Sequence, residues 1–317
     1  MKQIAILALS LLFMFSGCGE SIKGELIFVE SNSDQGFNYP YYLFIPERAP
    51  SEQELFVIIE PNNSGFVDDD LQKHVEKAAR TASKDFYLGN YVAQALKFPL
   101  LVPVFPRSKT NWKIYSHALD RDAILQKDND LERIDLQLIA MFEDARSKLR
   151  EMDYLTRDQF LLTGFSASAT FANRFTLIHP DRVYATAAGG LNGLLMLPND
   201  VLAGDELIYP VGTSDFTELL GQDFQSEAFK NTPQFYFMGA LDDNDAIPYD
   251  DGYDSAERSL IYKLIGETMQ PDRWEYSQQK YREMEVNVKL ITYPDTGHEH
   301  PDYVKKEVVD FFREFIQ

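Results

Sequence analysis

The sequence predicts an α/β fold in which helices flank a mostly parallel central sheet. Two observations carry this prediction. Short, continuous apolar runs such as Leu55–Ile59 and Leu100–Phe105 are typical of strands that are covered on both faces. They alternate with helical stripes, in which apolar residues recur every three or four positions, as in residues 131–149. Such alternation favours parallel strands joined by helices.

The individual elements follow from the same patterns. Gly24–Glu30 and Tyr41–Ile45 are expected to form an opening antiparallel pair. Further strands are expected at Leu55–Ile59, Leu100–Phe105, Gln159–Thr163, Val183–Ala188, Gln234–Met238 and Val286–Tyr293. Helices are expected at Leu71–Ser83, Leu131–Leu149, Ala167–His179, Ser255–Gly266 and Tyr303–Phe315.

Residues 18–317 show no internal repeat and no low-complexity linker, so we expect one domain. Residues 190–232 fit the alternation poorly and contain several glycines and prolines. We interpret them as an insertion or lid. Because they follow a central strand, they are expected over the carboxyl edge of the sheet, where ligands bind in this architecture.

The first 17 residues have the features of a secretory signal peptide. Lys2 precedes an apolar run, Ile4–Phe15, that is too short to span a bilayer comfortably. Small residues then precede Cys18, the only cysteine of the chain, and this pattern resembles the lipobox of bacterial lipoproteins. We expect lipidation of Cys18 and tethering to the cell envelope, with Gly19 suiting the outer membrane of a Gram-negative cell. The alternative is an ordinary secretory signal followed by a chance cysteine.

The net charge of the chain limits the classes of partner that it is expected to bind. Thirty basic and 50 acidic residues give a net charge of −20. A surface this negative argues against nucleic acid, and against adhesion to anionic lipid by charge alone. Membrane contact is therefore expected through the lipid anchor only. The oligomeric state is not indicated.

A candidate nucleophile lies between a predicted strand and a predicted helix. The segment Gly164-Phe165-Ser166-Ala167-Ser168 matches the nucleophile elbow Gly-x-Ser-x-Gly except at its last position. Serine at 168 is still small, as the close approach of strand and helix requires. In this context Ser166 is the predicted nucleophile, and the alternative is a helix N-cap serine.

A serine nucleophile needs a histidine base, and in this architecture the base follows the last strand. Of five histidines, His298 stands directly after Gly297 at that point, and His300 is its competitor. His74 is expected at the surface of the first helix. His179 closes the elbow helix, and His117 precedes the serine.

The base must be oriented by a carboxylate located between the serine and the histidine in the sequence. Asp242 follows the strand that ends near Gly239, and we prefer it to Asp245, which precedes Ala-Ile-Pro. Six aspartates fall within residues 242–254, but they lack the glycine and the closing glutamate of a calcium loop. No metal site is predicted.

The negative charge of a tetrahedral intermediate requires N–H donors. The Ala167 N–H, directly after the nucleophile, is one candidate. The second is expected from the loop after Leu55–Ile59, where Asn62 or Asn63 would donate through the backbone or the side-chain amide. Pro-Asn-Asn-Ser-Gly is also strong turn chemistry.

Together, the elbow around Ser166, the acid loop ending in Asp242 and the histidine loop at His298 resemble the α/β-hydrolase superfamily over essentially the whole chain after residue 18. Within it, the chain resembles secreted bacterial esterases related to polyhydroxybutyrate depolymerases and feruloyl esterases. The resemblance implies an eight-stranded sheet, no cofactor, and hydrolysis of a small or polymer-derived ester through an acyl-enzyme. Ser168 and the Asn-Asn loop depart from the usual pattern.

Two other functions remain open. A peptidase of prolyl-oligopeptidase type shares the triad, but the chain has no propeller domain. A lipoprotein that uses the fold only for binding is the second, since a fold does not imply activity. Retention of three triad residue types in the required order argues against it.

Overall fold

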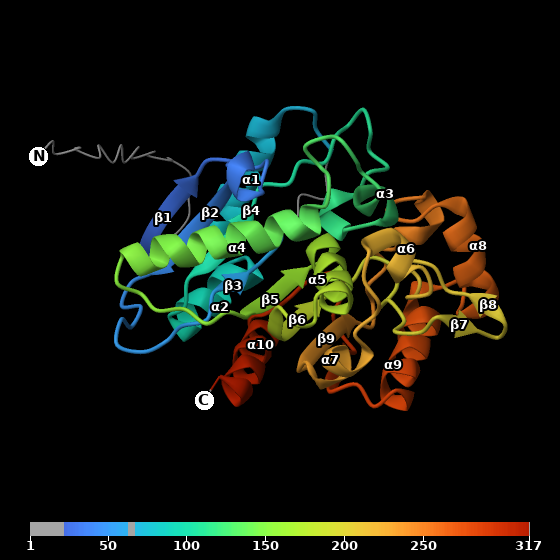
Figure 1. Ribbon diagram of the computed structural model, residues 1–317. Helices are drawn as coiled ribbons and strands as arrows, with labels where there is room; N and C mark the ends of the chain where they lie inside the picture. The colour runs from blue at the N-terminus through green and yellow to red at the C-terminus, as the bar shows by residue number, and fades with distance from the viewer. Residues whose placement is uncertain (1–21, 63–66, 317) are drawn as a thin grey trace, which may run out of the picture.

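An eight-stranded sheet forms the centre of the computed structural model, which describes residues 22–62 and 67–316 (Figure 1). Its strands are β1 (Gly24–Val29), β2 (Tyr41–Pro46), β3 (Ile58–Ile59), β4 (Leu100–Pro103), β5 (Phe160–Phe165), β6 (Val183–Gly189), β9 (Gln234–Gly239) and β10 (Val288–Tyr293). They lie in the order β1-β2-β4-β3-β5-β6-β9-β10, and only β2 runs against the others. The predicted fold class is confirmed, with the number of strands that the resemblance implies.

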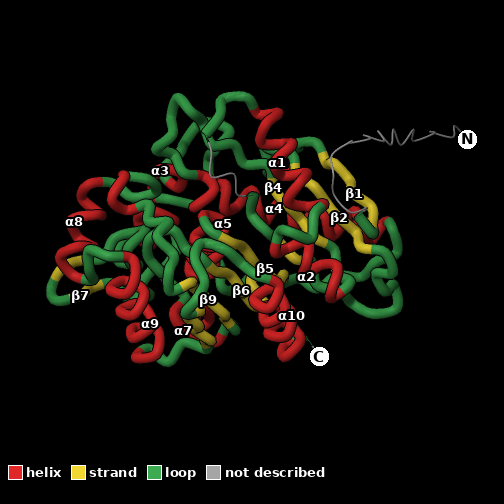
Figure 2. Tube along the Cα trace, turned by 180° about the vertical axis from the view of Figure 1, so that it is seen from behind, coloured by secondary structure: helices red, strands yellow, loops and turns green. Residues whose placement is uncertain are grey.

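Helices cover both faces of the sheet (Figures 1 and 2). One face packs against α4 (Ile134–Glu151), α5 (Ala167–Ile178) and α9 (Trp274–Glu283), and the other against α1 (Leu71–Ser83), α2 (Leu88–Leu96) and α10 (Asp302–Phe315). Neighbouring strand residues alternate between these two cores. Ile58 belongs to one core and Ile59 to the other, as the two-residue repeat of a strand requires. The remaining helices are α3 (Arg121–Ile124), α6 (Phe216–Leu220), α7 (Ser226–Asn231) and α8 (Ser255–Leu264).

Besides the short helices α3, α6 and α7 and a small two-stranded hairpin, which were not predicted, one expected strand is shorter and the two longer helices α2 and α9 were missed. Of the strand expected over Leu55–Ile59, only β3 pairs regularly with its neighbours. Leu55 makes a single isolated bridge with Thr156. Helix α2 was missed because its start has no side-chain cap of its own. Instead Glu60, directly after β3, accepts the Gly89 N–H at 2.7 Å. Helix α9 was missed because it is largely polar.

Residues 190–232 run along the flank of α5. Near the elbow, Thr170 donates to Asn192. At the far end, Gln222 donates to Ile178 O, the last residue of α5. Between them lie a small hairpin, β7 (Val201–Leu202) and β8 (Asp205–Glu206), and helix α6, and α7 follows Gln222.

Three expectations concern residues outside the described part of the chain: the signal segment 1–17, lipidation of Cys18, and Asn63. Among residues 22–62 and 67–316, no helix is long and apolar enough to cross a membrane.

Candidate active site

Ser166 lies at the carboxyl edge of the sheet, in the turn between β5 and α5. Its backbone has φ 64° and ψ −130°, a conformation that non-glycine residues rarely adopt. The Ser166 N–H donates to Gly189 O on β6 at 3.0 Å, which fixes the turn to the neighbouring strand. A sharp turn of this kind projects the serine side chain beyond the end of the strand, as a nucleophile elbow requires.

Small residues let strand and helix approach each other at this turn. A Cβ on Gly164 would lie 2.5 Å from Ser168 O, so a larger residue requires backbone movement. Ser168 Oγ accepts the Phe165 N–H at 2.9 Å and donates to Phe165 O at 2.8 Å. The hydroxyl that replaces the usual glycine therefore binds the backbone of the turn, and it is buried.

The acid loop and the histidine loop meet beside the elbow because β9 and β10 are neighbours in the sheet. The Leu241 N–H donates to Thr296 O at 3.0 Å, and this contact joins the two loops directly. A Cβ on Gly239 would lie 2.2 Å from the same Thr296 oxygen. Glycine at 239 is therefore a condition for bringing the two loops together.

This approach pairs His298 with Asp242. His298 Nδ1 lies 2.9 Å from Asp242 Oδ2 and 3.1 Å from Oδ1. The carboxylate is buried, with 1% of its side chain exposed, whereas 27% of the imidazole is exposed. A buried acceptor fixes the proton of the ring on Nδ1, so Nε2 is left as the acceptor that faces outward.

The two competing residues have other partners. Asp245 Oδ2 accepts from Arg273 Nη2 at 2.5 Å, and Arg273 is fully buried. His300 packs edge-on against Phe165, with ring centroids 4.5 Å apart. Burial lowers the pKa of His300 to about 4, which makes it a poorer general base. Among the described contacts, the one between histidine and carboxylate at this edge joins His298 and Asp242.

The other histidines lie in the interior. The expectation that His74 lies at the surface is wrong: it is fully buried, with Nε2 3.0 Å from Asp68 O. His117 Nε2 lies 2.7 Å from Phe105 O, and burial lowers the pKa of His117 to about 3. His179, at the end of α5, lies 2.8 Å from Asp135 Oδ2 and has a structural role.

Sequence reasoning missed Asn244, which lies between the predicted nucleophile and the predicted base. Its Nδ2 is 3.4 Å from Ser166 Oγ and 3.2 Å from His298 Nε2. The Asn244 N–H donates to Asp242 Oδ1 at 3.0 Å. This side-chain turn, in which an aspartate accepts from the N–H two residues on, was the signal available in the sequence.

The candidate oxyanion donors occupy different environments. Ala167 is the first residue of α5, so its N–H is one of those that a helix leaves without an internal acceptor. The Asn62 side chain is buried and pairs with the Phe105 backbone, donating from Nδ2 and accepting at Oδ1, both at 3.1 Å. Its amide therefore secures the loop after β3 to the end of β4.

Beside the elbow, Tyr115 and Ala118 pack against Ala167. The Arg107 guanidinium stacks on the Tyr115 ring, 3.4 Å from its centroid, and forms an ion pair with Asp251. Burial raises the pKa of Tyr115 to about 12, so this wall of the site stays uncharged except for the ion pair.

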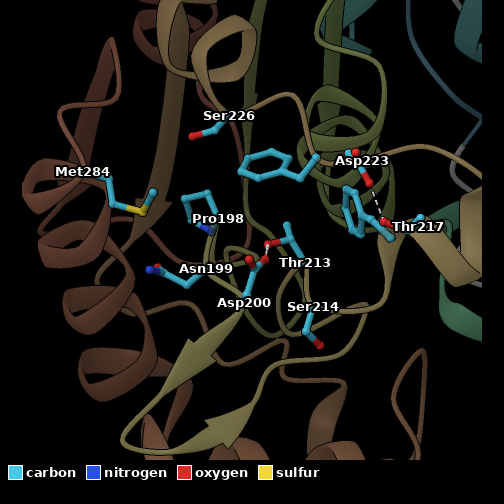
Figure 3. A pocket seen from close by; sticks show the side chains of 11 residues that line it. Pro198, Asn199, Asp200, Thr213, Ser214, Thr217, Asp223, Ser226 and Met284 are labelled. Carbon is cyan, nitrogen blue, oxygen red and sulfur yellow. Dashed lines mark hydrogen bonds between the residues drawn. The ribbon is translucent and has the colours of Figure 1, made fainter.

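A surface pocket of about 460 Å³ is shown in Figure 3. It is lined by residues of the segment 198–226 and by Met284 at the end of α9. Ser166, Asp242, Asn244 and His298 are not among its lining residues. It does not belong to the site around Ser166.

A metal centre requires several donor side chains at one point. Within the described ranges, no three His, Cys, Asp or Glu side chains gather in this way.

Comparison with known proteins supports the fold. No protein-family model matches the sequence, and no curated protein sequence does. A poly(aspartic acid) hydrolase from Sphingomonas sp. KT-1 is 14% identical, with a TM-score of 0.58 over 92% of this chain and 97% of that one. An S-formylglutathione hydrolase from Agrobacterium tumefaciens is 10% identical, with a TM-score of 0.51 over 94% and 96%. A thermostable esterase is 14% identical, with a TM-score of 0.51 over 92% of this chain and 63% of that one. The chain has the α/β-hydrolase fold.

Proposed function

We propose that the protein is a serine hydrolase that cleaves carboxylic esters through an acyl-enzyme. The observation that carries this proposal is the Asp242–His298 pair beside the strained turn at Ser166. Strained serine backbones persist where the surrounding structure enforces them, and they cluster at reactive sites. The names of the structural neighbours, which include hydrolases and an esterase, agree with this class.

In the proposed reaction, Ser166 Oγ attacks the ester carbonyl carbon while His298 Nε2 takes the hydroxyl proton. Asp242 orients the ring through Nδ1 and stabilises its positive charge. The Ala167 N–H, with a second donor from residues 62–63, stabilises the oxyanion. His298 then returns the proton to the departing alcohol, and water releases the acid by the same steps. These steps require no cofactor and no metal.

Local charge supports an uncharged or cationic ester as substrate. Of the six aspartates in residues 242–254, three pair with arginines: Asp245 with Arg273, Asp250 with Arg258, and Asp251 with Arg107. Asp242, Asp243 and Asp254 have no arginine or lysine partner among the described residues, and the whole chain carries −20. An anionic substrate is repelled by such a field.

The proposal is tested with a fluorophosphonate probe and p-nitrophenyl acetate. We expect labelling and turnover in the wild type, and neither in Ser166→Ala. Replacing acetate by the anionic hemisuccinate should lower kcat/KM, with partial recovery at high salt. A well-folded wild type that is not labelled would leave the fold as a binding module.

We further propose that Cys18 carries the lipid that tethers residues 18–317 to the cell envelope, as in secreted bacterial lipoproteins. Metabolic labelling with a palmitate analogue should modify the wild type but not Cys18→Ser. Labelling that persists in Cys18→Ser would exclude this anchor.

A further inference from the structure

Asn244 lies between Ser166 and His298, where the serine proton passes to the imidazole in the proposed reaction. Its Nδ2 lies within 3.4 Å of both Ser166 Oγ and His298 Nε2. Within the described residues, no hydrogen bond joins Oγ directly to Nε2. The serine hydroxyl therefore accepts from an amide in this arrangement, whereas attack on an ester requires it to donate to the imidazole.

The Asn244 side-chain amide has enough N–H donors to bind both His298 Nε2 and Ser166 Oγ. Because Nδ1 donates to Asp242, Nε2 of the neutral ring accepts. A side-chain amide nitrogen has two N–H donors, one for Nε2 and one for Oγ. As long as both bonds are present, the lone pair that should receive the serine proton is occupied.

The backbone around Asn244 is fixed on both sides. On one side, its own N–H binds Asp242 Oδ1. On the other side, Asp245 is held by the buried Arg273, which also donates to Gly193 O at 3.1 Å. The Asn244 side chain is exposed, and among residues 22–62 and 67–316 its side-chain hydrogen bonds are those to Ser166 and His298. Rotation of this side chain alone can therefore clear the space between Ser166 and His298.

Resting on the proposed hydrolase function, we propose that Asn244 is a positioning residue that latches the free enzyme. Its amide separates the Ser166 hydroxyl from the His298 imidazole until a substrate displaces it. The latch limits reaction with molecules too small to move the amide, so it contributes to substrate selection.

The test is the rate at which a small fluorophosphonate labels Ser166. Labelling forms the Oγ–phosphorus bond and releases fluoride, with His298 taking the serine proton. We compare the wild type with Asn244→Ala, which removes the amide, and with Asn244→Leu, which keeps a side chain of similar size without N–H donors. Asp243→Ala is the matched control, because Asp243 is exposed in the same loop and, among the described residues, no hydrogen bond or ion pair joins its side chain to Ser166 or His298.

Both Asn244 variants should be labelled about fivefold faster, the factor that one hydrogen bond of typical net strength is worth. Asp243→Ala should label at the wild-type rate, and the unfolding midpoints should be unchanged. A merely structural role would slow labelling, so a gain distinguishes the two. Unchanged or slower labelling in both variants overturns the latch, as does a gain in Asn244→Ala alone, which would indicate steric screening.

The experiment gives a different result if the proposed hydrolase function itself is wrong. If Ser166 is not the nucleophile, the wild type is not labelled or Ser166→Ala is labelled equally. If only the latch is wrong, labelling depends on Ser166 but not on Asn244.

Discussion

Asp242 and Asp245 are three residues apart in one loop, and we expect their substitution to have different effects. Loss of Asp242 should lower activity, whereas loss of Asp245 should lower stability. Asp242 contacts His298, whereas Asp245 neutralises Arg273, a fully buried cation. Asp242→Asn keeps the shape of the side chain but offers the imidazole an N–H in place of a carboxylate oxygen. Asp245→Ala leaves the Arg273 guanidinium without its carboxylate.

The magnitudes follow from burial. Removing one partner of a buried ion pair destabilises a protein by about 3–5 kcal/mol. Asp245 is 16% exposed and Arg273 also donates to two backbone carbonyls, so we expect the lower end, about 3 kcal/mol. With an unfolding entropy of about 2.1 cal/mol/K per residue over about 300 residues, that lowers Tm by roughly 5 °C. Loss of the orienting carboxylate lowers kcat by about 10⁴-fold in triads of this type.

The assay combines thermal unfolding with initial rates on p-nitrophenyl acetate, measured well below the Tm of either variant. Asp242→Asn should unfold like the wild type and lose activity. Asp245→Ala should unfold earlier, and its folded fraction should remain active within about tenfold. If Asp245→Ala loses activity at an unchanged Tm, the assignment of the two aspartates is wrong.

Three further predictions use the same structure. Burial raises the pKa of Glu60 to about 8 from an ordinary 4.5, so folding takes up a proton between these values and stability falls as pH rises through them. Glu60→Gln should remove this slope, by at most about 4 kcal/mol between pH 5 and pH 8 in denaturant titrations. Gly239→Ala should separate the acid and histidine loops and lower kcat/KM about 10²-fold, because its Cβ would lie 2.2 Å from Thr296 O. Ser166→Gly should abolish ester turnover yet raise stability by about 1 kcal/mol in calorimetry, since glycine adopts φ 64° without strain.

Each of these three predictions has a control measurement that can contradict it. Parallel loss of stability in the wild type and Glu60→Gln between pH 5 and pH 8 would show that other groups set the slope. Gly297→Ala is the control for Gly239→Ala, because its Cβ would meet nothing closer than Leu241 O at 3.8 Å. Ser166→Ala, which keeps a Cβ, should lack the stability gain of Ser166→Gly, and equal stability of the two would argue against backbone strain.

The order of the strands and of the loops that follow them could be predicted because buried strands show as apolar runs. Helix α2 could not, since its N-terminus depends on Glu60, 29 residues away from Gly89 in the sequence. His74 was misplaced for a related reason. It lies on a helix of mixed polarity, and groups outside that helix contact it, among them Asp68, the loop after β4 and the His117 ring.

At the site, sequence order was sufficient to select Ser166, Asp242 and His298 as candidates, because parallel strands end at one edge. Distances were not predictable. Asp245 and His300 fitted the sequence pattern almost as well, and only their contacts with Arg273 and Phe165 distinguish them. Asn244 carries no chemical signature of its own, and its relevance arises from where the turn at Asp242 directs its side chain.

Backbone contacts, more than side chains, set the geometry of this edge. The Ser166 N–H binds Gly189 O, the Leu241 N–H binds Thr296 O, and glycine stands at 164 and 239, where a Cβ would collide with backbone. We expect substitutions at these points to disturb Ser166, Asp242 and His298 together. Asn244, by contrast, is an exposed loop residue at the mouth of the site, and its replacement leaves these contacts intact. We therefore expect substrate selection to change through such loop positions, while the fold and the reactive groups stay in place.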